Sequence, residues 1–160
     1  MTDRKVEDAY VVVNGAGAAA IATAKLFKAY GVKPENLVMC DSQGVIYSGR
    51  KSVNKFKEEF VTTRSCRTLK EALVGADAFI GVSAANLLTA EDVATIAKKP
   101  LIFAMANPVP EISPDEARKG CPDAIIATGR SDYPNQVNNV MCFPFLFRGT
   151  LDVQGHSINE

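Results

Sequence analysis

Two glycines separated by one residue follow a short run of β-branched residues near the start of the chain. The run is Val11-Val12-Val13, and Asn14-Gly15-Ala16-Gly17 comes directly after it. Gly15 permits a tight turn, and Gly17 lets the backbone approach a phosphate with no side chain in between. The alanines that follow begin a helix, whose N-terminal N–H groups and partial positive charge attract an anion. Strand, glycine turn and helix in this order predict a site for the pyrophosphate of a dinucleotide.

The residues expected to hold the pyrophosphate are Gly15, Ala16, Gly17, Ala18 and Ala19. Ala20 stands where the third glycine of the motif is usual, and a small residue there lets the helix pack close to the strand. The alternative for so short a motif is a plain strand–helix connection that binds nothing. The context of a strand before it and a helix after it favours the cofactor site.

Asp41 follows a second apolar run and lies close to the spacing expected for a carboxylate that holds the adenosine ribose. A turn residue is the alternative, since Asp41-Ser42-Gln43-Gly44 also has good turn chemistry. A carboxylate at this place ordinarily favours NAD over NADP. Nearby lysines could instead reach a 2′-phosphate or could simply be a solvated face. Those lysines are Lys51, Lys55 and Lys57.

Neutral amide side chains gather in the loops after the later strands. Ser83 begins one loop, Asn107 lies in the next, and the last runs from Thr128 to Asn139. Loops at the carboxyl ends of parallel strands converge on one ligand site. Asparagine both donates and accepts hydrogen bonds, so it suits a nicotinamide carboxamide, a hydroxyl or a carboxylate. We expect Ser83 and Asn107 to contact the cofactor, although an isolated asparagine is more often a turn or helix cap.

The elements that must position these residues alternate between strand and helix. The apolar runs are continuous rather than alternating, as in strands that are covered on both faces. Capping residues mark helix starts at Thr68, Thr89 and Ser113. The pattern predicts an α/β fold: a Rossmann-type, doubly wound, mainly parallel sheet with helices on both faces. Strands are expected at 10–13, 36–40, 78–82, 101–105 and 124–127, a short extension or hairpin at 44–50, and helices at 18–30 (mostly buried) and 53–60.

Composition limits the function classes. The 160 residues form one predicted domain with a formal net charge of zero, which gives no basis for capture of nucleic acid or of an anionic membrane. No apolar run approaches the length of a membrane span. The four cysteines are scattered, as in a reduced cytoplasmic protein. With one histidine and no carboxylate cluster, no metal site is expected in the chain.

Several strings together resemble malic enzyme, and most of all its short bacterial type. They are Asn14 to Ala19, Asp41-Ser42-x-Gly44, Ala106-Asn107-Pro108-x-Pro110-Glu111-Ile112, Thr128 to Asn139, Phe143-Pro144 and Phe147-Arg148-Gly149. The resemblance covers residues 1–160 as the family's NAD(P)-binding domain. The family's catalytic lysine, tyrosine acid and metal-binding acidic residues have no counterpart here. We therefore expect an excised or separately encoded cofactor domain without a catalytic residue of its own.

The resemblance implies oxidative decarboxylation of (S)-malate to pyruvate and CO₂ with NAD or NADP, and with Mg²⁺ or Mn²⁺ held outside this chain. It assigns malate binding to Asn107 and Asn138, supported by Asn139, and it implies a cytoplasmic homo-oligomer for the full-length enzyme. Alone, the chain is expected to bind dinucleotide without turning over malate. Another NAD(P)-dependent dehydrogenase and a non-catalytic dinucleotide-binding module remain as alternatives.

Overall fold

The computed structural model describes residues 4–51 and 53–158 and contains a six-stranded sheet with the order β3-β2-β1-β4-β5-β6. Every pair of neighbouring strands is parallel except β2 with β3, which form a short antiparallel hairpin. The strand order reverses between β1 and β4, as in a doubly wound fold. The strands are β1 (Val11–Asn14), β2 (Leu37–Asp41), β3 (Gly44–Val45), β4 (Ala78–Gly81), β5 (Leu101–Ala104) and β6 (Ile125–Thr128).

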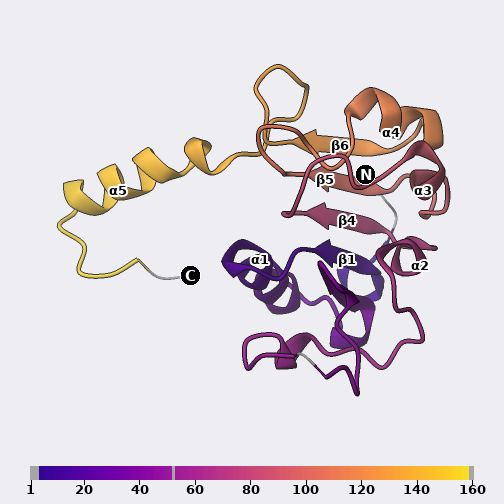
Figure 1. Cartoon of the computed structure of the whole chain (residues 1–160). Helices are drawn as coiled ribbons and strands as arrows, with labels where there is room; N and C mark the ends of the chain where they lie inside the picture. The colour runs from indigo at the N-terminus through magenta and orange to yellow at the C-terminus, as the bar shows by residue number, and fades with distance from the viewer. Residues whose placement is uncertain (1–3, 52, 159–160) are drawn as a thin grey trace.

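Helices α1 to α4 cover the two faces of the sheet (Figure 1). Alanines of α1 join one buried cluster with the β1 side chains Val11 and Val13. Side chains of α2, α3 and α4 join the other cluster, which contains Val12 of the same strand. The α-helices are α1 (Ala18–Ala29), α2 (Leu69–Leu73), α3 (Ala90–Ala94), α4 (Pro114–Gly120) and α5 (Phe143–Asp152), and the 3-10 helices are η1 (Val6–Asp8), η2 (Pro34–Asn36), η3 (Glu58–Phe60) and η4 (Asn139–Met141).

The parallel register aligns the carboxyl ends of five strands. Asn14 of β1 lies opposite Cys40 of β2 and Gly81 of β4. Gly81 in turn lies opposite Ala104 of β5, which pairs with Thr128 of β6. The loops that follow these strands therefore leave the sheet along one edge. The predicted Rossmann-type fold is confirmed, and the loops that carry the candidate residues begin at one end of the sheet.

Three helices begin at the predicted caps. The Thr68 side chain accepts a hydrogen bond from the Glu71 N–H, and the Ser113 side chain accepts one from the Glu116 N–H. The complete reciprocal capping box is at Thr89, where the Asp92 carboxylate also accepts from the Thr89 N–H. At the first cap, the Glu71 carboxylate accepts instead from the N–H of the preceding residue, Arg67.

Two expectations about helices are wrong. Helix α1 is not mostly buried, because only Ala20 and Ala24 are buried, while Leu26 is exposed. The stretch 53–60 is not one helix, because only Glu58–Phe60 forms a short 3-10 turn. In that stretch the Asn54 side chain accepts hydrogen bonds from the N–H groups of residues 56 and 57. Such local bonds compete with helix formation.

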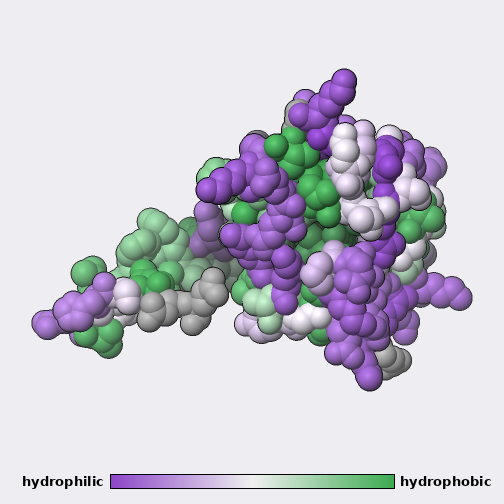
Figure 2. Space-filling model, turned by 90° about the horizontal axis from the view of Figure 1, so that it is seen from below, coloured by the Kyte–Doolittle hydropathy of each residue, from purple (hydrophilic) through white to green (hydrophobic). Residues whose placement is uncertain are grey.

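The last helix, α5, leads away from the sheet instead of packing on it (Figure 1). None of its residues is buried. Figure 2 shows hydrophobic side chains along this projecting arm. All four cysteines are free. Within residues 4–51 and 53–158, no helix is both long and apolar enough to span a membrane.

Candidate functional site

A cavity of about 740 Å³ opens at the carboxyl ends of β1, β2 and β4. Four of the predicted cofactor residues line it: Gly15, Ala16, Asp41 and Ser83. The other three of the glycine turn, Gly17, Ala18 and Ala19, are exposed at the adjoining start of α1. The cavity crosses the point where the strand order reverses, which is where doubly wound sheets bind their ligands.

The two glycines of the turn have different roles in the structure. Gly15 has φ of +125°, and a Cβ there would lie 2.7 Å from the carbonyl oxygen of Val82. Its backbone N–H donates to the carbonyl of Cys40 at 2.9 Å, which ties the turn to β2. Gly17 has an ordinary backbone conformation, and a Cβ there would meet no atom within 4 Å. The fold itself thus requires Gly15, whereas the space above Gly17 is open.

Asp41 lies at the end of β2 with two cationic side chains on its carboxylate. Arg50 donates to both carboxylate oxygens at 2.7 and 2.8 Å, and Lys57 donates to Oδ2 at 2.7 Å. The Gln43 N–H donates to Oδ1 at 2.9 Å. Only 8% of the Arg50 side chain and 19% of the Lys57 side chain are exposed. Two positive charges therefore surround this one negative charge, and of the two cations Lys57 lines the cavity.

Opposing effects act on the pKa of Asp41. Desolvation of the carboxyl raises it, while the hydrogen bonds from Lys57, the Gln43 N–H and Arg50 lower it. The hydrogen bonds together prevail, so the pKa of Asp41 lies below its ordinary value. The carboxylate stays ionised at neutral pH and holds both cations in place.

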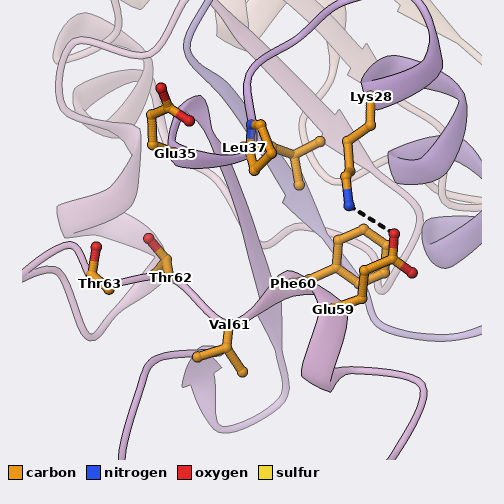
Figure 3. Close-up of a pocket in the computed structure, with 9 residues that line it drawn as sticks. Lys28, Glu35, Leu37, Glu59, Phe60, Val61, Thr62 and Thr63 are labelled. Atoms are coloured by element: carbon orange, nitrogen blue, oxygen red, sulfur yellow. Dashed lines mark hydrogen bonds and ion pairs between the residues drawn. The ribbon is translucent and has the colours of Figure 1, made fainter.

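A second cavity shows how the segment that carries Lys57 is fixed. It measures about 250 Å³ and lies between α1 and the residues around η3 (Figure 3). Across it Lys28 of α1 donates to the Glu59 carboxylate at 2.7 Å, and the Lys28 ammonium also lies 5.5 Å from the Phe60 ring centroid. Phe60 itself is buried. These contacts anchor the end of the segment, so that Lys57, just before it, is directed to Asp41.

The predicted malate residues Asn107 and Asn138 line a separate, open hollow of about 410 Å³ beside the ends of β5 and β6. Arg130 contributes to its wall, with its guanidinium paired to Asp132 and donating to the carbonyl of Pro108 at 3.0 Å. The structure thus brings Asn107 and Asn138 together. Asn139 lies outside this hollow, exposed in η4.

The amide of Asn138 is engaged in local structure. Its Nδ2 donates to the carbonyl of Gly129 at 2.7 Å, and its Oδ1 accepts from the Val140 N–H at 3.0 Å, which caps η4. The helix-cap interpretation of an isolated asparagine therefore applies here. A substrate at Asn138 would have to share or replace one of these hydrogen bonds.

Two residues with central positions were not singled out from the sequence. Asn14, at the end of β1, is buried and donates from Nδ2 to Ser83 Oγ at 2.7 Å. Glu111 is completely buried and accepts hydrogen bonds from the loops after β4 and β5. The available signal was the charged Glu111 between the nonpolar residues Pro110 and Ile112, since a glutamate that is buried requires hydrogen-bonding partners.

Metal ligands were not expected, and the part of the chain that the structure describes contains no group of three or more His, Cys, Asp or Glu side chains that could hold a metal ion. The residues at the site fit a dinucleotide better. An open space at Gly17, a glycine turn at a helix N-terminus and paired cations beside Asp41 are features that accommodate phosphate groups.

Comparisons with known proteins agree with this geometry. The family model "Malic enzyme, NAD binding domain" matches residues 1–160. An NADP-dependent malic enzyme from Halomonas elongata is 54% identical over 98% of this chain and 37% of its own length. Another from Rhizobium meliloti is 53% identical over 100% of this chain and 21% of its own length. The crystal structure of an NAD-dependent malic enzyme from Thermotoga maritima has a TM-score of 0.84 and 41% identity, over 94% of this chain and 41% of that one.

The chain accordingly spans 21% to 41% of the lengths of these relatives. The family match covers all 160 residues, and the fold and the glycine-turn cavity are those of a dinucleotide-binding domain. This sets aside an unrelated dehydrogenase as the source of the fold. The chain belongs to the malic enzyme family and corresponds to its NAD-binding domain.

Proposed function

We propose that the chain binds NADP in the cavity at the ends of β1, β2 and β4, as the cofactor half of an enzyme that converts malate to pyruvate and CO₂. Gly15 to Ala19 hold the pyrophosphate, Asp41 and its two cations lie at the adenosine ribose, and Ser83 and Asn107 face the nicotinamide half. The observation that carries this proposal is the pair of cations at the end of β2: Arg50 and Lys57 both contact Asp41. Bound NADP⁺ supplies the hydride acceptor for oxidation of malate.

The preference for NADP follows from the local charge. An uncompensated aspartate at this position repels a 2′-phosphate and favours NAD. Here the Asp41 carboxylate is neutralised, and Lys57 retains the flexible ammonium that can turn to a phosphate. Relatives named for either cofactor occur among the similar proteins. The charge arrangement in this chain favours the phosphorylated one.

The rest of the proposal concerns the complete enzyme. Asn107 and Asn138, with Asn139 in support, orient malate beside the nicotinamide. Mg²⁺ or Mn²⁺ and the acid and base of the reaction come from parts of the enzyme other than these residues. A homo-oligomer in the cytoplasm is the expected setting, and the four free cysteines are consistent with a reducing compartment.

Binding measurements test the cofactor assignment directly. Titration of the chain with NADPH and NADH, followed by nicotinamide fluorescence, should give tighter binding of NADPH. Lys57→Gln should weaken NADPH binding by about tenfold while leaving NADH binding nearly unchanged, since it removes a charge-assisted bond to the 2′-phosphate alone. Lys55→Gln, an exposed position two residues away, is the control. Equal affinities for the two cofactors in the wild type would overturn the NADP preference, and absence of binding would overturn the function.

A further inference from the structure

One buried carboxylate, that of Glu111, lies between two hollows. The first is the cavity lined by Gly15, Asp41 and Ser83, here called the cofactor cavity, and the second is the hollow lined by Asn107 and Asn138, here called the malate hollow. Glu111 follows the loop after β5 and none of its surface is exposed. Its backbone carbonyl accepts from the Leu88 N–H at 3.0 Å, and the preceding carbonyl, of Pro110, accepts from the Asn86 N–H at 3.0 Å. Two backbone hydrogen bonds therefore hold the segment that carries Glu111 against the loop after β4.

Each carboxylate oxygen of Glu111 serves a different loop. Oε1 accepts from the N–H of Ser83 at 3.0 Å and from its hydroxyl at 3.2 Å. Oε2 accepts from the N–H of Ala106 at 3.0 Å. All three partners are donors, which suits an ionised carboxylate. In the described part of the chain no cationic side chain forms an ion pair with Glu111.

Both loops bear candidate ligand contacts. Ser83 lines the cofactor cavity and receives a further hydrogen bond from Asn14 of β1. Ala106 directly precedes Asn107, which lines the malate hollow. A continuous chain of hydrogen bonds thus runs from Asn14 through Ser83 and Glu111 to the backbone next to Asn107.

The sheet leaves room for this carboxylate at Gly81. A Cβ built at Gly81 would collide with the Glu111 carboxyl group. The glycine at the end of β4 is therefore what allows the carboxylate to lie against the strand between the two loops. Burial of a carboxylate lowers the stability of the fold unless hydrogen-bond donors surround its oxygens.

We propose that Glu111 is a positioning residue that fixes the loop after β4 and the loop after β5 at one separation, so that Ser83 and Asn107 meet the nicotinamide half of the cofactor together. The inference rests on the proposed function. It assigns no contact between Glu111 and the ligand, because its oxygens are occupied by Ser83 and Ala106. The adenosine half of the cofactor lies on the β2 side of the cavity and does not depend on this bridge.

Two probes separate these halves. NADPH spans the whole cavity, whereas adenosine 2′,5′-bisphosphate carries the adenosine and the 2′-phosphate without the nicotinamide. Glu111→Gln keeps the size of the side chain but places an NH₂ group against one backbone N–H, so one loop is released. We expect NADPH binding to weaken by about tenfold and bisphosphate binding to stay within about twofold of the wild type, by calorimetry. The control is Glu116→Gln, which removes a partly exposed carboxylate that pairs with Lys119 on α4.

The possible outcomes separate this inference from the proposed function. If the wild type binds neither probe, the proposed function is wrong and the inference falls with it. If the wild type binds both and Glu111→Gln binds NADPH equally well, or loses both probes in equal proportion, only the positioning role is overturned. Should Glu111→Gln fail to fold, amide NMR of the wild type decides: the Ser83 and Ala106 signals should shift with NADPH and not with the bisphosphate, and the opposite pattern contradicts the role.

Discussion

Single residues in this domain combine structural and binding duties, and Asp41 is the clearest case. The sequence suggested either a ribose contact or a turn residue. The structure shows a carboxylate that joins β2 to Arg50 and Lys57 while accepting from the Gln43 N–H of the adjoining turn. Removing it would leave two poorly exposed cations without their common partner, which is destabilising.

The lowered pKa of Asp41 predicts a pH dependence of stability. The folded-state pKa lies below the unfolded value of about 3.9, so the contribution of the ionised carboxylate is complete above about pH 4 and is lost as the pH falls through the folded value. The Asp41→Asn variant has no carboxyl group at this position, so its stability carries no contribution from the ionised form. The difference in free energy of unfolding between wild type and Asp41→Asn should therefore be largest near neutral pH and shrink below about pH 4.

Urea denaturation at a series of pH values measures this difference. Asp115→Asn serves as the control, because Asp115 is 88% exposed and pairs only at the helix surface with Arg118. Its difference from the wild type should be small at every pH. A difference for Asp41→Asn that stays constant down to acid pH would show that the carboxylate is not the group that holds this network.

The sequence indicated which polar side chains lie in the loops, but it did not indicate their hydrogen-bond partners. The asparagine-rich loop marked a polar site, yet Asn138 uses its amide to cap η4 and to hold Gly129. Glu111 was quoted only as part of a motif, because its importance depends on backbone N–H groups 28 and 5 residues away. The hydrogen bond from the Ser83 N–H, 28 residues away, depends on how the sheet places the two loops, and no local pattern contains it.

At the scale of elements, the turn between β1 and α1 separates folding from binding. Gly17→Val places a side chain in open space at the start of α1, so its cost in stability should be about 1 kcal/mol or less, while the pyrophosphate is excluded and NADPH binding is abolished. Gly15→Ala should instead cost about 1–3 kcal/mol, since it strains the backbone and crowds the Val82 carbonyl.

Thermal unfolding and fluorescence titration of the two variants measure these effects side by side. The prediction requires Gly17→Val to unfold close to the wild-type temperature without binding cofactor. NADPH binding of wild-type strength by Gly17→Val would mean that the phosphates do not lie over this turn. A Gly15→Ala variant as stable as the wild type would show that the +125° conformation is not needed.

Most elements could be predicted because their signals are local. Continuous apolar runs identified the parallel strands, and Ser or Thr caps identified the starts of α2, α3 and α4. The prediction failed at 53–60, where the charge pattern suits a helix but Asn54 bonds the following N–H groups and Lys57 bonds Asp41. Tertiary contacts and a local turn there override helix propensity.

At the scale of the whole molecule, the unusual feature is the arm formed by α5, whose large apolar side chains are exposed and not packed on the sheet. Phe143, Phe145 and Leu151 have 62%, 71% and 74% of their surface exposed, and Phe143 and Phe147 form an edge-to-face pair with centroids 5.2 Å apart. A contiguous exposed apolar surface of this kind is typical of an interaction site.

We expect the chain to associate with a second copy through this helix. Because apolar surface is removed from water when two such arms pack together, the apparent mass by light scattering should rise with protein concentration. Replacing Phe143 and Phe147 together by Ser should shift the chain toward monomer, and the loss of stability should stay near 0.5 kcal/mol for each exposed position, roughly the limit for surface changes. Tyr30→Ser, at the C-cap residue of α1 with 73% of its surface exposed, is the matched control and should leave association unchanged. A monomer at every concentration, or a double variant that associates like the wild type, would show that α5 does not join copies of this chain.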